Sequence, residues 1–521
     1  MPWWTVVLLA PLVACQQISA IPGPQCQDFA SSYKLSAEQI AKAGISNITA
    51  NNVEIALNFE RSNWATPSVT DGPFYHLPSN INWTSSIPAG TVFAVENVTN
   101  TSLYTLPAAV SLSRIIYQTT TINGTNIPAS AYVLWPYLPR TFPNITGLPV
   151  IGWGHGTSGV VSECGPSHIR NLWYQFAGPY TMALQGYVVV APDYAGLGIS
   201  TIKPAPSSAS ADPSSSYSSS YQKEEEEEEG AASADNPNRI LHPYLSNPSH
   251  ALDILHGVRA AQAAFPALSA HHVVVGHSQG GGAAWSAAAA VAKAPPSAFP
   301  GYLGAVAGSP APSGANYLAL LSAPGAATLA LAAYVAWGIR ALYPEVAPGE
   351  LFTPAGLARF ELLRELGGCS SVATELFDGN ASVGDTEWVR PDVAGHWAVR
   401  AFAKATDYVG EDVGGAPLLV LQGTEDPVVV PAQTAESARR ACGANAESAV
   451  EVVTFEGVTH VPVMYAGQRV WLDWVEDRFR GVPVEKGCRN RTLAGLRVEE
   501  GAYLKESNFV LDWVTEGYQT A

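Results

Sequence analysis

One pentapeptide of the chain has the residue types and spacing of a nucleophile site. The sequence GHSQG at 276–280 matches the G-x-S-x-G pattern, with Ser278 at its centre. Valines at 273–275 precede it and a Gly- and Ala-rich stretch typical of a helix follows it. A strand-to-helix turn of this kind holds the serine in a strained conformation with its hydroxyl exposed. The sequence therefore predicts that Ser278 is a nucleophile.

Two later residues are candidates for the base and the acid that such a serine needs. A serine hydroxyl is a weak nucleophile at neutral pH, so it requires a base and a group that orients the base. Asp426 follows the apolar run 417–423, and His460 follows the apolar run 450–455. Glu425 is the competing acid. The order Ser, Asp, His along the chain is that of the α/β-hydrolases rather than that of chymotrypsin or subtilisin.

A glycine-rich loop after an earlier apolar run is the candidate oxyanion hole. The sequence GHGT at 154–157 follows the run 148–153, where a loop can bring backbone N–H groups to a substrate oxygen. We expect the two donors to be the N–H of Gln279 and that of Thr157. His272 is interpreted as part of a strand. Asp193 is interpreted as a turn residue, with an indirect catalytic role as the alternative.

The sequence predicts neither a metal site nor a cofactor. No C-x-x-C pair is present, so zinc and redox dithiol sites lack their usual ligands. His242, His250 and His256 are spaced by eight and six residues, which does not place them on one helix face. We therefore reject a metal site at these histidines.

Apolar runs without alternation are typical of parallel strands that are covered on both faces. Helix-like segments lie between several of these runs, which predicts an α/β fold with a mostly parallel, doubly wound sheet. The region 90–145 instead alternates apolar and polar residues, and Asn123-Gly124 predicts a hairpin there, so antiparallel strands precede the parallel ones. The predicted parallel strands are 148–153, 186–193, 271–278, 302–308, 417–423 and 450–455.

Two insertions interrupt the alternation of strands and helices. The Ser- and Glu-rich stretch 203–237 has almost nothing to bury and is expected to be a disordered surface loop. The segment 311–415 is helical in character, and Pro324-Gly325 divides its apolar part into pieces too short to cross a membrane. We expect a helical cap, or lid, over the site. The predicted organisation is a signal peptide at 1–20, an N-terminal segment at 21–147, hydrolase core at 148–310, the cap at 311–415, and the rest of the core with a C-terminal segment at 416–521.

Composition and net charge exclude one class of partner. The chain has 521 residues, of which 47% are hydrophobic and 14% charged, so it can bury more than one core. Its formal net charge of -17 repels a phosphate backbone, so nucleic acid is not expected as a partner. No transmembrane segment is predicted once the leader is removed.

The first twenty residues and the asparagines indicate secretion. Residues 1–20 contain an apolar run of about fourteen residues after Met1 and end in small residues, which is typical of a signal peptide cleaved after Ala20, although no Lys or Arg precedes the run. A lipid anchor at Cys15, in a bacterial lipoprotein, is the alternative. Against it stand eight N-x-S/T sequons, which favour a glycosylated extracellular protein. They lie at Asn47, Asn82, Asn97, Asn100, Asn123, Asn144, Asn380 and Asn490.

Five cysteines remain after removal of the leader, and an oxidising compartment predicts two disulfides with one odd thiol. Residue identity alone does not decide which cysteines pair, and Cys26 is a candidate for the leftover. The five are Cys26, Cys164, Cys369, Cys442 and Cys488.

Taken together, these motifs resemble the secretory lipases of the α/β-hydrolase superfamily, over about 148–312 and 415–475. The resemblance rests on GWGHGTSG, CGPSHIRN, GYVVVAPDYAGLG, HPYL, GHSQGG and QGTEDPVV with its later histidine. It implies serine esterase chemistry, a helical lid and no cofactor. It also implies the disulfides Cys164–Cys369 and Cys442–Cys488. The insertion between YAGLG and HPYL departs from the family, in which this connection is short.

The expected reaction is the two-step hydrolysis of a carboxylic ester through an acyl-enzyme. The expected partners are an ester or lipid substrate and, transiently, a lipid interface. A secreted prolyl-type peptidase, a tannin or feruloyl esterase, and a non-catalytic binding ectodomain on the same scaffold are the alternatives. The usual mark of the last, a missing triad member, is absent.

Overall fold

A computed structural model of the chain describes residues 33–70, 72–78, 87–202, 238–312, 330–377 and 387–497, with 499, 502 and 503. Several sequence-based expectations concern residues outside these ranges. They concern the leader 1–20 with Cys15, Cys26, the insertion 203–237, Asn82, Asn380 and the residues 313–329 of the expected cap.

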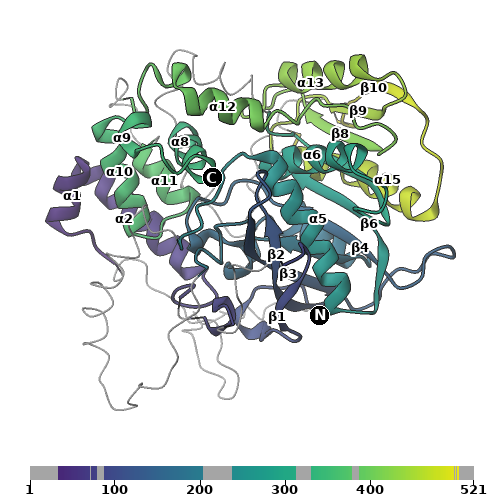
Figure 1. Cartoon of the computed structure of the whole chain (residues 1–521), viewed down its shortest axis with the longest axis horizontal. Helices are drawn as coiled ribbons and strands as arrows, with labels where there is room; N and C mark the ends of the chain where they lie inside the picture. Colours follow the sequence, from purple (N-terminus) through teal and green to yellow (C-terminus); the bar gives the residue numbers. More distant parts are fainter. Residues whose placement is uncertain are drawn as a thin grey trace, which may run out of the picture.

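A sheet of ten strands forms the centre of the described structure (Figure 1). Its strand order is β1-β2-β3-β5-β4-β6-β7-β8-β9-β10. The pairs from β1 to β5 are antiparallel, and every other pair is parallel. The strands span Val92–Glu96 (β1), Val110–Thr120 (β2), Asn126–Pro136 (β3), Leu148–Gly154 (β4), Val188–Pro192 (β5), Leu268–His277 (β6), Tyr302–Gly308 (β7), Leu418–Gly423 (β8), Ala449–Phe455 (β9) and Gly487–Leu493 (β10).

The strands formed as the sequence predicts. Each of the six apolar runs is a parallel strand, β4 to β9. The hairpin at Asn123-Gly124 joins β2 to β3, and Gly124 adopts the positive φ of 79° that such a turn requires. The α/β-hydrolase fold with antiparallel N-terminal strands is therefore confirmed. Strand β10 was not predicted.

Helices cover both faces of the sheet, because successive strand residues point to opposite sides. Val273 and Val275 of β6 pack in a core with α3, α14 and α15, whereas Val274 packs with α5, α6 and α13. Among the described helices, none is both long enough and apolar enough to cross a bilayer. These helices span Pro179–Leu184 (α3), Asn247–Ala264 (α5), Gln279–Lys293 (α6), Pro431–Ala444 (α13), Pro462–Ala466 (α14) and Gln468–Arg480 (α15).

The remaining helices form a second group beside the sheet (Figure 1, left). The described part of the predicted cap is helical, and its buried residues share one core with the N-terminal helices α1 and α2. The residue patterns did not predict that these N-terminal helices pack with the cap. The group comprises Ala37–Ala43 (α1), Asn47–Ser62 (α2), Ala330–Leu342 (α8), Pro348–Leu351 (α9), Pro354–Glu365 (α10), Ser370–Phe377 (α11) and Trp397–Ala405 (α12).

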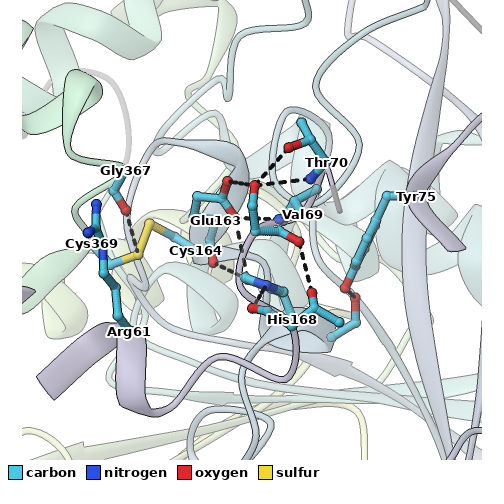
Figure 2. A network of polar contacts seen from close by, with 12 residues as sticks. Arg61, Val69, Thr70, Tyr75, Glu163, Cys164, His168, Gly367 and Cys369 are labelled. Carbon is cyan, nitrogen blue, oxygen red and sulfur yellow. Dashed lines mark hydrogen bonds and ion pairs between the residues drawn. A yellow bond between two sulfur atoms is a disulfide. The ribbon is translucent and has the colours of Figure 1, made fainter. Parts of the chain in front are cut away.

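Two disulfides fasten the fold, and both pairings that the resemblance implies are confirmed. Cys442–Cys488 joins α13 to β10, and Cys164–Cys369 joins the loop after β4 to the start of α11. Figure 2 shows the polar network around the second of these bridges. There the carboxylate of Glu163 accepts hydrogen bonds from the hydroxyl of Ser68 and the N–H of Val69, both at 2.8 Å.

Candidate active site

Ser278 occupies the turn between β6 and α6 in a strained backbone conformation. Its φ is 57° and its ψ is -119°, a region that residues with a side chain rarely adopt. Hydrogen bonds on both sides of the residue hold it there. Its N–H donates to the carbonyl of Gly308 at 2.9 Å, and its own carbonyl accepts from the N–H of Ala311 at 2.9 Å. Only 9% of the residue is exposed.

Gly276 and Gly280 are needed because they lack a side chain and not because of their backbone conformation, since neither has a positive φ. A Cβ on Gly276 would overlap the carbonyl of Gly280. A Cβ on Gly280 would in turn overlap the carbonyl of Gly154, at the end of β4. Helix α6 therefore begins in direct contact with the ends of two strands, as a nucleophile turn requires.

The imidazole of His460 and the carboxylate of Asp426 form a hydrogen-bonded pair. Nδ1 of His460 donates to Oδ2 of Asp426 over 2.8 Å. Because Nδ1 then carries the hydrogen, Nε2 is left as the proton acceptor. Asp426, rather than the competing Glu425, is the residue in this contact.

Three further donors hold the carboxylate of Asp426. Its Oδ1 accepts from the N–H groups of Val428 and Val429, both at 2.9 Å, and its Oδ2 accepts from the side-chain amide of Gln422 at 3.2 Å. Burial alone would raise the pKa of this carboxyl. The hydrogen bond and charge of His460, with help from the N–H of Val429, outweigh burial and lower the pKa to about 2. Asp426 is therefore ionised throughout the neutral range.

The parallel register brings the three side chains to one edge of the sheet. His277 pairs with Gly308 of β7, Gly308 pairs with Leu421 of β8, and Gly423 pairs with Phe455 of β9. Ser278, Asp426 and His460 each follow the carboxyl end of one of these strands. Within the described residues no hydrogen bond joins Ser278 to His460. Such contacts are often long in a free enzyme and shorten when substrate binds.

A relay that the sequence analysis missed holds the backbone of His460. The Nε2 of His277 lies 3.0 Å from the carbonyl oxygen of His460, and its Nδ1 lies 2.8 Å from the hydroxyl of Tyr174. A carbonyl only accepts, so Nε2 donates to it and Nδ1 accepts from the tyrosine. Burial lowers the pKa of His277 to about 3, which keeps this ring neutral. His277 lies within the motif, but no pattern marks Tyr174.

The loop of Thr157 lies beside the Ser278 turn, because Gly154 of β4 pairs with Gly276 of β6. The hydroxyl of Thr157 bonds the hydroxyl of Tyr244 at 2.7 Å, and the carbonyl of the next residue, Ser158, accepts from the N–H of Ser370 at 3.0 Å. Gln279 is the first residue of α6, so its N–H has no partner within the helix. The two expected oxyanion donors are therefore on adjacent segments.

The other polar candidates lie in the interior. Asp193, interpreted as a turn residue, directly follows β5; it is buried and accepts hydrogen bonds from the hydroxyls of Ser130 and Ser167, both at 2.5 Å. Burial raises the pKa of Asp193 to about 6. His272 is buried in β6, as predicted.

Two of the three histidines rejected as metal ligands lie together, although they do not share a helix face. The rings of His242 and His250 stack at 5.0 Å. His242 lies in the loop before α5, so helical spacing does not govern its distance from His250. In the described part of the chain, no group of three or more His, Cys, Asp and Glu residues is arranged to hold a metal.

Comparisons with known proteins place this geometry in context. A family model described as the alpha/beta hydrolase family matches residues 152–471. Solved structures with a similar fold include a lipase and an esterase. Lipase A of Candida antarctica in its closed state has a TM-score of 0.57 and 16% identity over 81% of this chain and 91% of the lipase. A ligand-bound form of the rice cell wall degrading esterase LipA of Xanthomonas oryzae has a TM-score of 0.54 and 19% identity over 76% of this chain and 100% of the esterase. No curated protein matches the chain.

Proposed function

This chain belongs to the alpha/beta hydrolase family, and we propose that it is a secreted serine hydrolase that cleaves carboxylic esters. One observation carries the proposal. The strained turn of Ser278 and the hydrogen-bonded pair of His460 and Asp426 lie at the same edge of the sheet. The similar structures are named as a lipase and an esterase, which supports ester bonds as the class of substrate.

The proposed reaction has two steps. In the first, Nε2 of His460 takes the proton of the Ser278 hydroxyl as its oxygen attacks the ester carbonyl carbon. The N–H groups of Gln279 and Thr157 stabilise the oxyanion. The imidazolium of His460 then protonates the leaving alcohol, and the C–O bond of the ester breaks to leave an acyl-enzyme.

In the second step, water repeats the sequence on the acyl-enzyme. His460 takes a proton from the water as the hydroxide attacks the acyl carbon, and it returns a proton to the oxygen of Ser278. The carboxylic acid leaves and the enzyme is restored. Asp426 remains ionised and stabilises the imidazolium in both steps, so the reaction consumes only the ester and water.

Surface features support secretion as part of the proposal. The six sequon asparagines that lie within the described residues are all exposed, and two disulfides are present. Exposure is what a glycan requires, and disulfides are typical of oxidising compartments. The exposed asparagines are Asn47, Asn97, Asn100, Asn123, Asn144 and Asn490.

Hydrolysis of p-nitrophenyl esters by the wild-type protein and by Ser278→Ala tests the proposal. We expect the substitution to remove nearly all turnover while the thermal unfolding transition is kept. An acyl series from acetate to oleate then separates two kinds of enzyme, since a lipase hydrolyses long chains faster above the concentration at which an interface forms. Hydrolysis by Ser278→Ala at the parental rate would refute the proposal.

A further inference from the structure

The side chain of Gln279 is held inside the protein by two histidines that the proposed reaction does not use. Its Nε2 lies 3.1 Å from Nε2 of His242 and 3.0 Å from Nε2 of His250. All three residues are buried. Tyr194 stacks on the ring of His242 at 6.1 Å and packs at 4.4 Å, tilted, on the ring of His250. The amide is therefore clamped between two imidazoles.

The surroundings of His242 fix the direction of its hydrogen bond, and those of His250 favour the same direction. Nδ1 of His242 lies 3.0 Å from the carbonyl oxygen of Ala195, which only accepts, so Nδ1 carries the hydrogen and Nε2 is an acceptor. Nδ1 of His250 faces the carboxylate of Asp253 at 4.0 Å, which favours the same tautomer. The amide of Gln279 then donates one N–H to each ring. The opposite amide orientation would set its oxygen against two lone pairs.

Both acceptors are available at neutral pH because the rings are uncharged. Burial lowers the pKa of His250 to about 3, and burial together with the nearby His250 lowers the pKa of His242 well below its usual range. A protonated ring would present a hydrogen where the amide of Gln279 needs a lone pair. The two neutral imidazoles therefore offer the two acceptors that the N–H groups of the Gln279 amide need.

The clamp acts on the residue whose backbone is next to the strained turn. Ser278 keeps its positive φ only if the groups around it prevent relaxation. Rotation of the peptide between Ser278 and Gln279 would relieve the strain and would turn the N–H of Gln279 away from the substrate oxygen. Anchoring the side chain of Gln279 opposes that rotation.

We infer that His242 and His250 are positioning residues, which hold Gln279 so that its backbone N–H faces the oxyanion formed at Ser278. The inference rests on the proposed function. It predicts a particular kinetic signature, because the N–H of Gln279 bonds the oxyanion of the transition state more strongly than the carbonyl of the bound ester. Loosening the clamp lowers kcat and leaves KM nearly unchanged.

The variant His250→Phe tests this inference. It keeps a ring against Tyr194 but removes the acceptor for Gln279. His256→Phe is the matched control, since His256 is also a buried histidine of α5 and its ring packs against Phe299 rather than Gln279. We expect kcat of His250→Phe to fall roughly ten- to hundredfold, with KM within about twofold of the wild type. The control retains kcat within about twofold.

Two further variants separate positioning from simple packing. His250→Gln places an amide oxygen near the position of Nε2, and we expect it to restore most of the lost kcat. Gln279→Met removes both N–H donors of the side chain, and we expect it to lower kcat. This variant tests the inference even if His250→Phe does not fold. Adding His250→Phe to Gln279→Met should cost little more, because the interaction is already absent.

The result that would overturn the inference is an equal kcat for His250→Phe and His256→Phe, or a kcat of Gln279→Met equal to that of the wild type. Additive losses in the double variant would also overturn it. Ser278→Ala is measured in the same series. If Ser278→Ala keeps ester hydrolysis, the proposed function is wrong; if it abolishes hydrolysis while His250→Phe behaves as its control, only the positioning role is wrong.

Discussion

At the scale of single residues, the carboxylate of Asp426 determines which tautomer His460 adopts. An asparagine at this position keeps the shape of the side chain but presents an N–H₂ group or a neutral oxygen to Nδ1 of His460. The proton of the imidazole can then move to Nε2, which no longer acts as the acceptor. We expect Asp426→Asn to lower kcat for ester hydrolysis about 10⁴-fold. Glu425→Gln is the control and should retain kcat within about twofold. A larger loss in Glu425→Gln than in Asp426→Asn would reassign the acid.

The relay from Tyr174 through His277 gives a second prediction at this scale. Tyr174→Phe removes the hydroxyl that bonds His277. A hydrogen bond contributes about 1 kcal/mol net. If this hydrogen bond serves to hold His460, its loss lowers kcat roughly fivefold. Tyr180→Phe is the control, because the hydroxyl of Tyr180 bonds the carbonyls of Thr105 and Asn171 instead. Equal kcat for the two variants would show that the relay does not position His460.

At the scale of elements, the sequence predicted the strands that are covered on both faces of the sheet. It missed a strand at the edge of the sheet, which is not. The six apolar runs became strands because a covered parallel strand must be apolar throughout. Strand β10 was missed because it lies at the edge of the sheet and carries exposed Arg489 and Arg491, which pair with Glu451. The sheet, and with it Ser278, Asp426 and His460 at one edge, was therefore predictable.

The polar partners of the site were not predictable to the same extent. Tyr174 contacts His277 from a loop in which four consecutive residues have a positive φ. None of these residue types predicts that conformation. His242 and His250 meet only because the loop that precedes α5 folds back onto it. Contacts that depend on loop geometry leave no periodic pattern, so the positioning residues became visible only in three dimensions.

The two disulfides differ in the length of chain that they close. Cys164–Cys369 spans 205 residues and Cys442–Cys488 spans 46. In the chain-entropy account the longer loop stabilises more, by about 1.3 kcal/mol. We expect Cys164→Ser/Cys369→Ser to lower the free energy of unfolding in urea by about that much more than Cys442→Ser/Cys488→Ser. The reverse order would show that local packing, not loop closure, dominates.

At the scale of the whole molecule, buried titratable groups make stability depend on pH. Burial lowers the pKa of six described histidines and raises that of three carboxyls to about 6 or 7. Between roughly pH 4 and 6.5 the histidines bind protons in the unfolded chain but not in the folded one, whereas the carboxyls do the opposite. The groups are His155, His242, His250, His256, His272 and His277, and Glu60, Asp193 and Asp253.

The histidines outnumber the carboxyls, so the unfolded chain binds more protons in this range. Stability therefore rises with pH, by about 1.4 kcal/mol per pH unit for each excess proton. We expect the free energy of unfolding in urea to increase from pH 4 to pH 6.5 and to change little from there to pH 8. A decrease over the lower range would mean that the carboxyls dominate.

The central claim is that Ser278 is the nucleophile, activated by His460. Mass spectrometry of the protein after reaction with a p-nitrophenyl phosphonate ester tests it most directly, because the phosphonate becomes attached to the oxygen that attacks it. We predict one adduct, on the peptide that contains Ser278, with labelling lost in Ser278→Ala and strongly slowed in His460→Ala. An adduct on another residue, or labelling at an undiminished rate in Ser278→Ala, would contradict the account.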